Sequence, residues 1–455
     1  MIIPRKGRQA VIVCVDVAML VLALYTALSI RWTHLPSGGE FLSHLYSILP
    51  ILAVWVISLY TAGLYSLDAP FTGYKVISHV SIIALLCLLL GFVFFYLHLD
   101  AFLVPKTILV LHAGAAFILI ILWRWIFNMV FSKFFPGVNV AFVGINETVL
   151  ELLCHSRQFS YMGYNGVCIL HRGHGEKKYC GVPVLEDVDS FVGRVKELRV
   201  QMVVFSGGAE DAGLVQDLLF KSLQDRIQFI DIPDFYETYL RRIPVSDINE
   251  LWFVKNINLK IKNIYAFFKT IIDIFMAVFL LAISLPFWPL LVLLIRMESP
   301  GPALFKQERV GYLGAPFVIM KFRTMRTAGN DFGPTEPGDN RVTRLGNFMR
   351  KTRLDEIPQF LNILTGDMSF IGPRPERPEL VSDLEKVVPF YRQRLLVKPG
   401  LSGWDQVSGE YHSPSVEDTY KKLQYDLYYI KNMSLFLDIS IFFKTLVTVF
   451  RRAGM

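Results

Sequence analysis

The chain has few cysteines and few charged residues for its length. Five of its 455 residues are cysteine, and no two of them have the C-x-x-C spacing of a metal or redox motif. We therefore expect reduced thiols at all five positions, Cys14, Cys87, Cys154, Cys168 and Cys180. Charged residues make up 19% of the chain against 53% hydrophobic residues, a balance typical of a membrane protein with soluble parts. No small-residue cleavage site follows the first apolar run, so we expect this run to stay as an anchor.

Four long apolar runs fill the N-terminal third of the chain. Each reaches the ~20 residues that a helix needs to cross the ~30 Å hydrocarbon core of a bilayer. They are Ala10–Ile30, Leu45–Tyr65, Val76–Leu99 and Thr107–Phe131. Basic residues before the first run and at the end of the fourth place both ends in the cytoplasm. Residues 1–135 are thus predicted to form a four-helix transmembrane bundle, in which Asp16 has a partner near the interface.

Residues 136–255 alternate short apolar runs, at 138–144, 166–170, 200–205 and 227–232, with helical patterns. Strands that alternate with helices indicate a parallel sheet, so we predict a Rossmann-like α/β module. The turn Gly144-Ile145-Asn146-Glu147 lacks the G-x-G-x-x-G of dinucleotide sites. A structural or regulatory module is therefore favoured over a module that binds NAD.

One later apolar segment, residues 270–296, is long enough to span a membrane but holds Pro286 and Pro289 in its middle. A full crossing would place the basic region after residue 300 outside the cell, against the positive-inside rule. We therefore predict a re-entrant helix broken at Pro286, with a kinked full span as the alternative.

Residues 434–452 are predicted to form an interfacial helix, with a core helix as the alternative. Between these segments the chain is loop-rich, with a polar loop at 324–340 and one helical pattern over 341–364.

Two adjacent carboxylates, Asp355 and Glu356, close a strongly basic stretch. Residues 306–353 hold ten Lys or Arg against four Asp or Glu, in a chain whose net charge is +7. Cations around an acidic pair suit a site that binds phosphates and attacks one of them. Neighbours on a helix point about 100° apart, so one carboxylate could attack phosphorus while the other positions a metal or moves a proton. The alternative is a solvated, charged helix face.

Several short motifs accompany the acidic pair. They are Ser299-Pro300-Gly301-Pro302, Gln307-Glu308-Arg309-Val310-Gly311, Lys321-Phe322-Arg323-Thr324-Met325, Leu354-Asp355-Glu356-Ile357-Pro358-Gln359, Gly372-Pro373-Arg374-Pro375 and Lys398-Pro399-Gly400-Leu401-Ser402-Gly403-Trp404. Together and in this order, after the apolar hairpin, they resemble the bacterial polyprenyl-phosphate sugar-1-phosphate transferases. These are monotopic phosphoglycosyl transferases that start exopolysaccharide and O-antigen repeat units. The resemblance covers residues 265–455, where it implies a mainly α catalytic domain, and residues 1–255 look like the additional part of the large family form.

The resemblance implies a reaction and its site residues. A UDP-sugar would donate sugar-1-phosphate to undecaprenyl phosphate at the cytoplasmic face of the bacterial inner membrane, with release of UMP and a need for Mg²⁺. By the same match Asp355 is the nucleophile that forms a covalent phosphosugar intermediate, Glu356 assists, and both carboxylates are metal ligands. Arg350 matches the phosphate-contacting arginine of the family. The other residues predicted to bind phosphate are Arg309, Lys321, Arg323, Arg353 and Arg374.

The chain departs from the family pattern at two places. Leu285-Pro286 replaces the Ser-Pro of the helix break, where Ser284 could supply the hydroxyl, and Ser408-Gly409-Glu410 stands where the family often has an arginine. The run 423–432 is similar to that of members tied to exopolysaccharide operons. The resemblance implies membrane lipid as a partner and does not imply nucleic acid. Whether the protein forms a homo-oligomer and which sugar it transfers both stay open. A non-catalytic membrane scaffold or regulator of polysaccharide synthesis is the alternative function.

Overall fold

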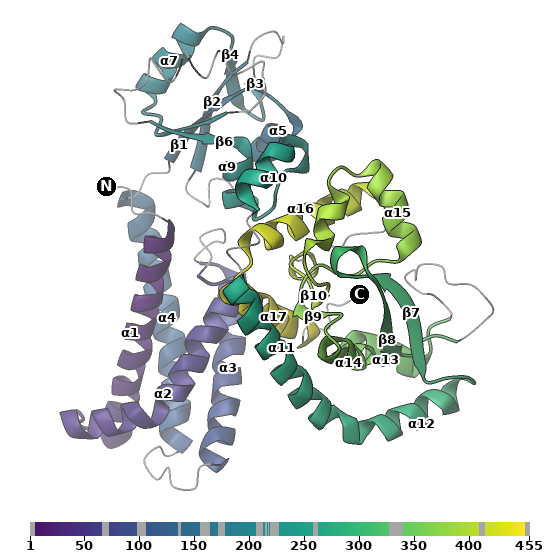
Figure 1. Ribbon diagram of the computed structural model, residues 1–455. Helices are drawn as coiled ribbons and strands as arrows, with labels where there is room; N and C mark the ends of the chain where they lie inside the picture. Colours follow the sequence, from purple (N-terminus) through teal and green to yellow (C-terminus); the bar gives the residue numbers. More distant parts are fainter. Residues whose placement is uncertain are drawn as a thin grey trace. The chain divides into compact units, whose positions relative to one another are not determined.

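The computed structural model (Figure 1) describes residues 5–65, 72–97, 106–134, 138–154, 164–171, 178–205, 213, 216, 218, 227–257, 263–326, 339, 341–408 and 415–450. The chain forms two compact units, Met1–Asp231 and Ile232–Met455. Within the described ranges, five helical segments are long and apolar enough to cross a membrane: Ala10–Trp32, Gly38–Tyr60, Val76–Tyr96, Lys106–Met129 and Ile264–Glu298. The coarse fold prediction is confirmed, because apolar helices, a mixed α/β sheet and a largely helical part follow one another along the chain.

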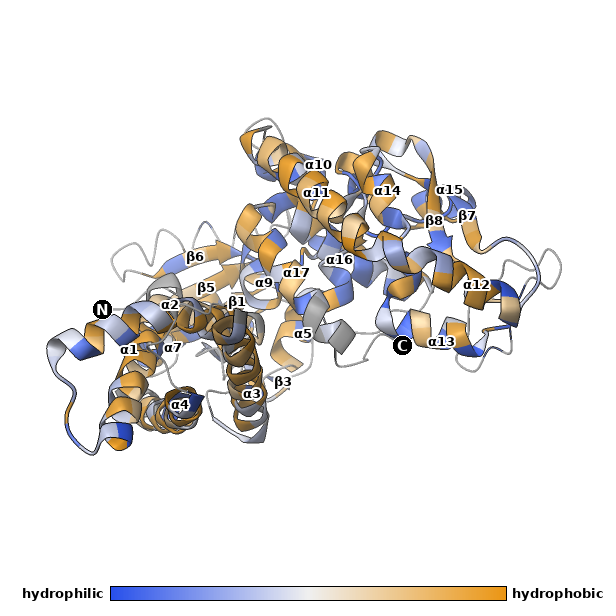
Figure 2. Cartoon of the chain, turned by 90° about the horizontal axis from the view of Figure 1, so that it is seen from below, coloured by the Kyte–Doolittle hydropathy of each residue, from blue (hydrophilic) through white to orange (hydrophobic). Residues whose placement is uncertain are grey.

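The apolar helices of the first unit are α1 (Arg5–Trp32), α2 (Gly38–Thr61), α3 (Tyr74–Leu97) and α4 (Lys106–Phe134), and Figure 2 shows hydrophobic residues along them. They share one apolar core. Asp16 was expected to have a partner, and the structure pairs it with Arg124, whose Nη2 lies 2.6 Å from the carboxylate. The indole of Trp123 donates to the same carboxylate at 2.9 Å. Both charged side chains are buried, so this ion pair joins α1 to α4 inside the packed helices.

A six-stranded sheet in the order β3-β4-β2-β1-β5-β6 forms the other part of the first unit. Its strands are β1 (Val138–Val143), β2 (Tyr164–Leu170), β3 (Lys178–Tyr179), β4 (Val182–Leu185), β5 (Met202–Phe205) and β6 (Gln228–Asp231), accompanied by α5 (Glu147–Cys154) and α7 (Val188–Glu197). Neighbouring strands are parallel except for β3 and β4. Without β3, the strand order is that of a doubly wound sheet, with the buried β1 in the middle.

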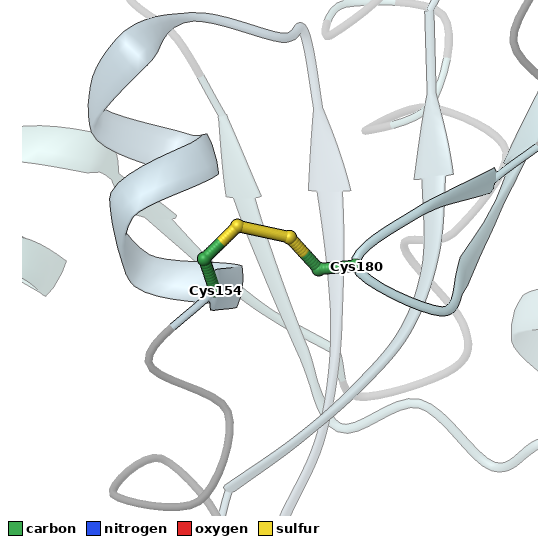
Figure 3. The surroundings of a disulfide bond; sticks show 2 residues. All are labelled: Cys154 and Cys180. Atoms are coloured by element: carbon green, nitrogen blue, oxygen red, sulfur yellow. A yellow bond between two sulfur atoms is a disulfide. The ribbon is translucent and has the colours of Figure 1, made fainter.

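Two cysteines of the sheet module depart from the expectation of reduced thiols. A disulfide joins Cys154, at the end of α5, to Cys180, in the turn between β3 and β4 (Figure 3). Their Cα atoms are 5.6 Å apart, which is ordinary for a disulfide. The expectation was wrong for this pair, because the pairing depends on how the sheet brings α5 to the β3–β4 turn and not on a local spacing. Cys14, Cys87 and Cys168 are free, as expected.

The second unit opens with three short helices, α9 (Ile232–Leu240), η1 (Val245–Asp247) and α10 (Glu250–Asn256). Their apolar side chains share a core with residues much later in the chain. Ile243 and Trp252, for example, belong to the same cluster as Leu423. The boundary that the sequence suggested at residue 255 therefore lies inside the compact unit that begins at Ile232.

The apolar segment of the second unit is interrupted at the prolines. Helix α11 (Asn263–Ser284) leads into the 3-10 turn η3 (Leu285–Phe287) and then α12 (Trp288–Glu298), and Figure 1 shows the chain changing direction there. Pro286 lies in η3, as expected for a residue that cannot donate a helical hydrogen bond. The hydroxyl of Ser284 donates to the carbonyl oxygen of Leu281 at 3.3 Å. The large apolar side chains of the segment are mostly exposed.

The remaining elements carry the motifs. Strands β7 (Leu304–Val310) and β8 (Pro316–Phe322) form an antiparallel hairpin, with the turn η4 (Tyr312–Gly314) between them, and β9 (Ser369–Ile371) pairs in parallel with β10 (Gly400–Ser402). The helices are α13 (Arg344–Thr352), η5 (Leu354–Glu356), α14 (Gln359–Leu364), α15 (Pro378–Val387), η6 (Tyr391–Leu396), η7 (Asp405–Val407), α16 (Val416–Asn432) and α17 (Leu435–Phe450). Most of the loop predicted at 324–340 lies outside the described residues, as does Glu410.

Candidate active site

The acidic pair lies on a tight turn and not on a continuous helix. Helix α13 ends at Thr352, and Arg353 takes a left-handed backbone conformation with φ of 57° before η5 carries the two carboxylates. The helical pattern expected over 341–364 is present as α13, η5 and α14, with breaks where Arg353 turns the chain and where Pro358 cannot continue the hydrogen-bond pattern. Asp355 is 8% exposed and Glu356 is 6% exposed. A solvated helix face would leave such side chains in water, so their burial argues for a site.

Three cations surround Glu356. Its Oε1 lies 3.1 Å from Nη2 of Arg374, 3.3 Å from Nη1 of Arg353 and 3.4 Å from Nζ of Lys321. Burial alone would raise the pKa of Glu356, but Lys321, Arg374 and Arg353 outweigh it and hold the pKa well below its usual value. Glu356 is therefore a permanent anion that gathers cations from β8, the Arg353 turn and the Gly372-Pro373-Arg374-Pro375 motif.

Asp355 lies in a different environment from its neighbour. Burial and the charge of Glu356 raise the pKa of Asp355 to about 6, against the opposing effect of Lys321, Arg353 and Arg350. Its Oδ1 is buried and has no hydrogen-bond partner among the described residues. Leaving a buried acceptor unsatisfied costs about 1–3 kcal/mol, so such an atom needs an explanation. A reactive or metal-binding role supplies one.

Arg350 lies on the Asp355 side of the site. It projects from the last turn of α13, and its Nε donates to Oγ1 of Thr324 at 2.9 Å. Its charge lowers the pKa of Asp355, so the two groups are electrostatically coupled. The structure thus gathers Arg350, Lys321, Arg353 and Arg374 around the acidic pair, as the sequence led us to expect.

Arg323 and Arg309 have other partners. The buried guanidinium of Arg323 donates to the carbonyl oxygens of Ser299 at 2.5 Å and Pro300 at 2.9 Å, which ties β8 to the turn after α12. Arg309 donates to the carbonyl oxygen of Pro375 at 3.1 Å. Among the residues that the structure describes, neither arginine forms an ion pair with Asp355 or Glu356. Arg323 thus holds backbone segments in place, and Arg309 in addition pairs with Glu376 at 3.5 Å and donates to Oε1 of Gln307 at 2.7 Å.

Two glycines explain how Arg374 reaches the site. Gly372 follows β9 and Gly400 begins β10, and the strands are linked by hydrogen bonds from Gly372 N to Ser402 O and from Gly400 N to Pro373 O, both 2.9 Å. A methyl group on Gly372 would lie 2.5 Å from the carbonyl oxygen of Lys398. The two motifs therefore pack backbone against backbone, and this contact sets the position of the Arg374 segment.

The aromatic ring of the Lys398–Trp404 motif is not presented to a ligand. Trp404 is buried, its ring stacks with Tyr428 at 5.8 Å, and the ammonium of Lys444 lies 4.5 Å from the ring centroid. Its indole nitrogen donates to the carbonyl oxygen of Arg241 at 3.0 Å. Trp404 therefore ties α16, α17 and the start of the second unit together.

Sequence reasoning missed two buried charged residues behind Arg374. Arg394, in η6, donates to the carbonyl oxygen of Arg374 at 3.0 Å and pairs with Asp426 of α16 at 2.8 Å. Asp426 lies in the run 423–432, and the similarity of this run to family members was the one signal in the sequence that could have marked Asp426. Arg394 lies in the stretch 388–397, which holds no recognised motif, so nothing in the sequence marked it.

The site offers one good metal ligand and no complete protein-built metal centre. In the described ranges no three His, Cys, Asp or Glu side chains come together. Glu356 Oε1 already contacts three cations, whereas Oδ1 of Asp355 is unsatisfied. Mg²⁺ is commonly held by one or two carboxylates together with substrate phosphates. Asp355 therefore fits Mg²⁺ better than Glu356 does, and the other ligands would have to come from substrate and water.

The second unit combines a buried acidic pair among cations with an exposed apolar helical segment, a combination that indicates a membrane-associated protein. A family model described as bacterial sugar transferase matches residues 264–452. The exopolysaccharide production protein PSS of Rhizobium leguminosarum bv. phaseoli is 38% identical over 192 residues, which cover 40% of this chain and 96% of that protein. The chain belongs to this family, the polyprenyl-phosphate sugar-1-phosphate transferases, and the family prediction is confirmed.

Two longer relatives are similar over more of the chain. The UDP-N-acetylgalactosamine-undecaprenyl-phosphate N-acetylgalactosaminephosphotransferase of Aeromonas hydrophila is 40% identical over 245 residues, 53% of this chain and 57% of that protein. The UDP-glucose:undecaprenyl-phosphate glucose-1-phosphate transferase of Xanthomonas campestris pv. campestris is 33% identical over 327 residues, 68% of this chain and 66% of that protein. The chain thus matches between about half and two thirds of the length of these relatives.

Proposed function

We propose that this protein transfers sugar-1-phosphate from a UDP-sugar to undecaprenyl phosphate, with release of UMP, as the first step in assembling an exopolysaccharide or O-antigen repeat unit. The observation that carries the proposal is the unsatisfied, buried Oδ1 of Asp355 beside a carboxylate that holds three cations. Family membership supports the choice of substrates, because the names of two relatives contain a UDP-sugar and undecaprenyl phosphate.

In the first half-reaction, an oxygen of Asp355 attacks the phosphorus that bears the sugar. The bond between this phosphorus and the oxygen that bridges the two phosphates breaks, and UMP leaves with the electron pair. The product is an acyl phosphate of Asp355 that carries the sugar. Lys321, Arg350 and Arg374 face the developing negative charge, and fixed cations in a water-poor site contribute most of the stabilisation in phosphoryl transfer.

In the second half-reaction, a phosphate oxygen of undecaprenyl phosphate attacks the same phosphorus. The bond to Asp355 breaks, the carboxylate is regenerated, and undecaprenyl diphosphate sugar is released. Glu356 keeps the cations in place through both steps. Asp355 would be the protein ligand of Mg²⁺, which would neutralise negative charge on the donor.

The proposed location follows from the two substrates, one dissolved in water and one embedded in lipid. We assign α11–α12 as the re-entrant element that holds the site at the cytoplasmic surface of the inner membrane, α17 as an interfacial helix, and α1–α4 as a four-helix transmembrane bundle. The length and apolar character of α1–α4 and of α11–α12 support their assignment. A re-entrant path also keeps the basic catalytic region on the same side as the ends of α1–α4.

A UMP-release assay tests this function. Purified full-length protein in detergent or nanodiscs is given undecaprenyl phosphate, Mg²⁺ and, in turn, UDP-glucose, UDP-galactose and their N-acetylated forms. We expect UMP release with at least one donor and none with Asp355→Asn. The matched control is Asp383→Asn, which removes an exposed carboxylate of α15 and should leave turnover unchanged. Equal turnover by Asp355→Asn and wild type would refute the proposed role, and no UMP with any donor would favour the scaffold alternative.

A further inference from the structure

A buried charge network lies behind Arg374, on the side away from Glu356. Arg394 is 6% exposed, and each nitrogen of its guanidinium has a partner. Nε donates to Oδ2 of Asp426 at 3.0 Å, Nη1 to the hydroxyl of Tyr391 at 2.7 Å, and Nη2 to the carbonyl oxygen of Arg374 at 3.0 Å. A planar fork with a partner at each of its three nitrogens is a rigid connector, and a lysine could not reproduce it.

The Arg374 segment needs such a connector. A small cavity of about 10 Å³ lies against it, lined in part by Val310, Arg374, Glu376 and Arg394. Hydrogen bonds to four successive carbonyl groups hold the segment beside this cavity, from Gly400 N to Pro373, from Arg394 to Arg374, from Arg309 to Pro375 and from Val310 N to Glu376. Of these four hydrogen bonds, the one from Arg394 is made to the carbonyl oxygen of Arg374, whose side chain pairs with Glu356.

We infer that Arg394 is a positioning residue for the transfer reaction, and that Asp426 keeps it in place. By holding the main chain of Arg374, Arg394 sets the guanidinium of Arg374 within 3.1 Å of Glu356. The chain of contacts runs from Asp426 on α16 through Arg394 and the backbone of Arg374 to the acidic pair. This inference rests on the proposed function, since it assigns a residue to that same site.

Stability alone is a poor account of this network. A buried ion pair contributes little net stability, because desolvation of both charges offsets most of their attraction. The arrangement does supply orientation, and orientation at a phosphate-binding arginine affects the rate of the reaction. If Arg394 orients Arg374, the rate loss caused by replacing Arg394 depends on the residue at position 374. If Arg394 only stabilises the fold, the rate loss does not depend on that residue.

A double-mutant cycle separates them. Donor-dependent UMP release is measured for Arg394→Lys, first in the wild-type background and then with Arg374→Lys. We expect a loss of at least about tenfold in kcat in the wild-type background and a clearly smaller factor with Arg374→Lys, because a flexible lysine reaches Glu356 from a range of backbone positions. Asp426→Asn should repeat the pattern, and Asp426→Glu should restore part of the rate.

The control pair lies on the same helix as Asp426. Lys431 of α16 pairs with Glu237 of α9 at 2.6 Å, and neither residue belongs to the Arg374 segment or to the acidic pair, so Glu237→Gln should change the melting temperature without a change in kcat. If Arg394→Lys or Asp426→Asn does not fold, Tyr391→Phe removes one hydrogen bond from Arg394 and leaves no charge unpaired. Equal loss factors in both backgrounds for the folded variants overturn the inference. A wild-type protein that releases no UMP with any donor refutes the proposed function instead, so the two failures are distinguishable.

Discussion

Replacement of Gly372 by alanine is the substitution whose effect follows most directly from the structure. A methyl group at this position would lie 2.5 Å from the carbonyl oxygen of Lys398 and 2.9 Å from the amide nitrogen of Gly400. Both are backbone atoms, so no side chain can rotate away to relieve the contact. The two strands β9 and β10 would have to separate by roughly 1 Å to restore ordinary van der Waals distances.

The cost to stability and the cost to activity should differ in size. Overpacking of this kind costs about 1–3 kcal/mol, which in a unit of this size lowers the melting temperature by roughly 2–10 °C. Arg374 follows Gly372 by two residues, and its ion pair to Glu356 is 3.1 Å long. A shift of about 1 Å in a positioning group can reduce the rate on the order of 100-fold. We therefore expect Gly372→Ala to stay folded and to lose most of its UMP release.

The assay combines thermal unfolding with UMP release on the same preparation. Gly193→Ala is the matched control, since a methyl group at this position of α7 meets nothing within 4 Å, and it should gain about 0.5–1 kcal/mol from helix propensity. Wild-type turnover by Gly372→Ala at an unchanged melting temperature would show that the β9–β10 contact does not position Arg374. A rate loss in Gly193→Ala of similar size would show that the assay reports general damage.

Three further predictions concern the packing of each unit. Arg124→Met leaves Asp16 buried without its partner, so unfolding in detergent should become about 3–5 kcal/mol easier, and Asp16→Leu added to it should recover much of this loss. Asp438→Asn removes the charge that faces Lys269 at 2.7 Å and should destabilise the contact between α11 and α17 by about 3 kcal/mol, measured by urea unfolding. Peptide mapping under non-reducing conditions should recover Cys154 and Cys180 in one linked fragment; two separately alkylated peptides would contradict this pairing.

The membrane segments and the parallel strands could be predicted because their signals are local. An apolar run of sufficient length leaves little choice but a long helix, and α1 to α4 correspond to the four predicted runs. The runs at 138–144 and 200–205 likewise became β1 and β5. The strand β3 was missed because it spans only two residues, and β4 because Pro183 interrupts its short apolar run. The disulfide was missed because its partners meet only in the folded sheet.

The composition of the site was predictable, but its geometry was not. Charge and motif order marked Lys321, Arg353 and Arg374, and the structure brings all three to Glu356. Sequence does not reveal whether an arginine will meet a carboxylate or a main-chain carbonyl group, which is why Arg323 was grouped with them. The turn before the acidic pair was also hidden, because Arg353 belongs to a residue type that ordinarily continues a helix.

The covalent step at Asp355 is the central claim, and a donor-only labelling experiment tests it most directly. The purified protein is incubated with the UDP-sugar that supports UMP release, without undecaprenyl phosphate, and its peptides are examined by mass spectrometry. The account predicts a sugar-phosphate adduct on Asp355, formed together with UMP and discharged when undecaprenyl phosphate is added. UMP release that requires both substrates at once, with no adduct on Asp355, would contradict it and point to direct transfer between donor and acceptor.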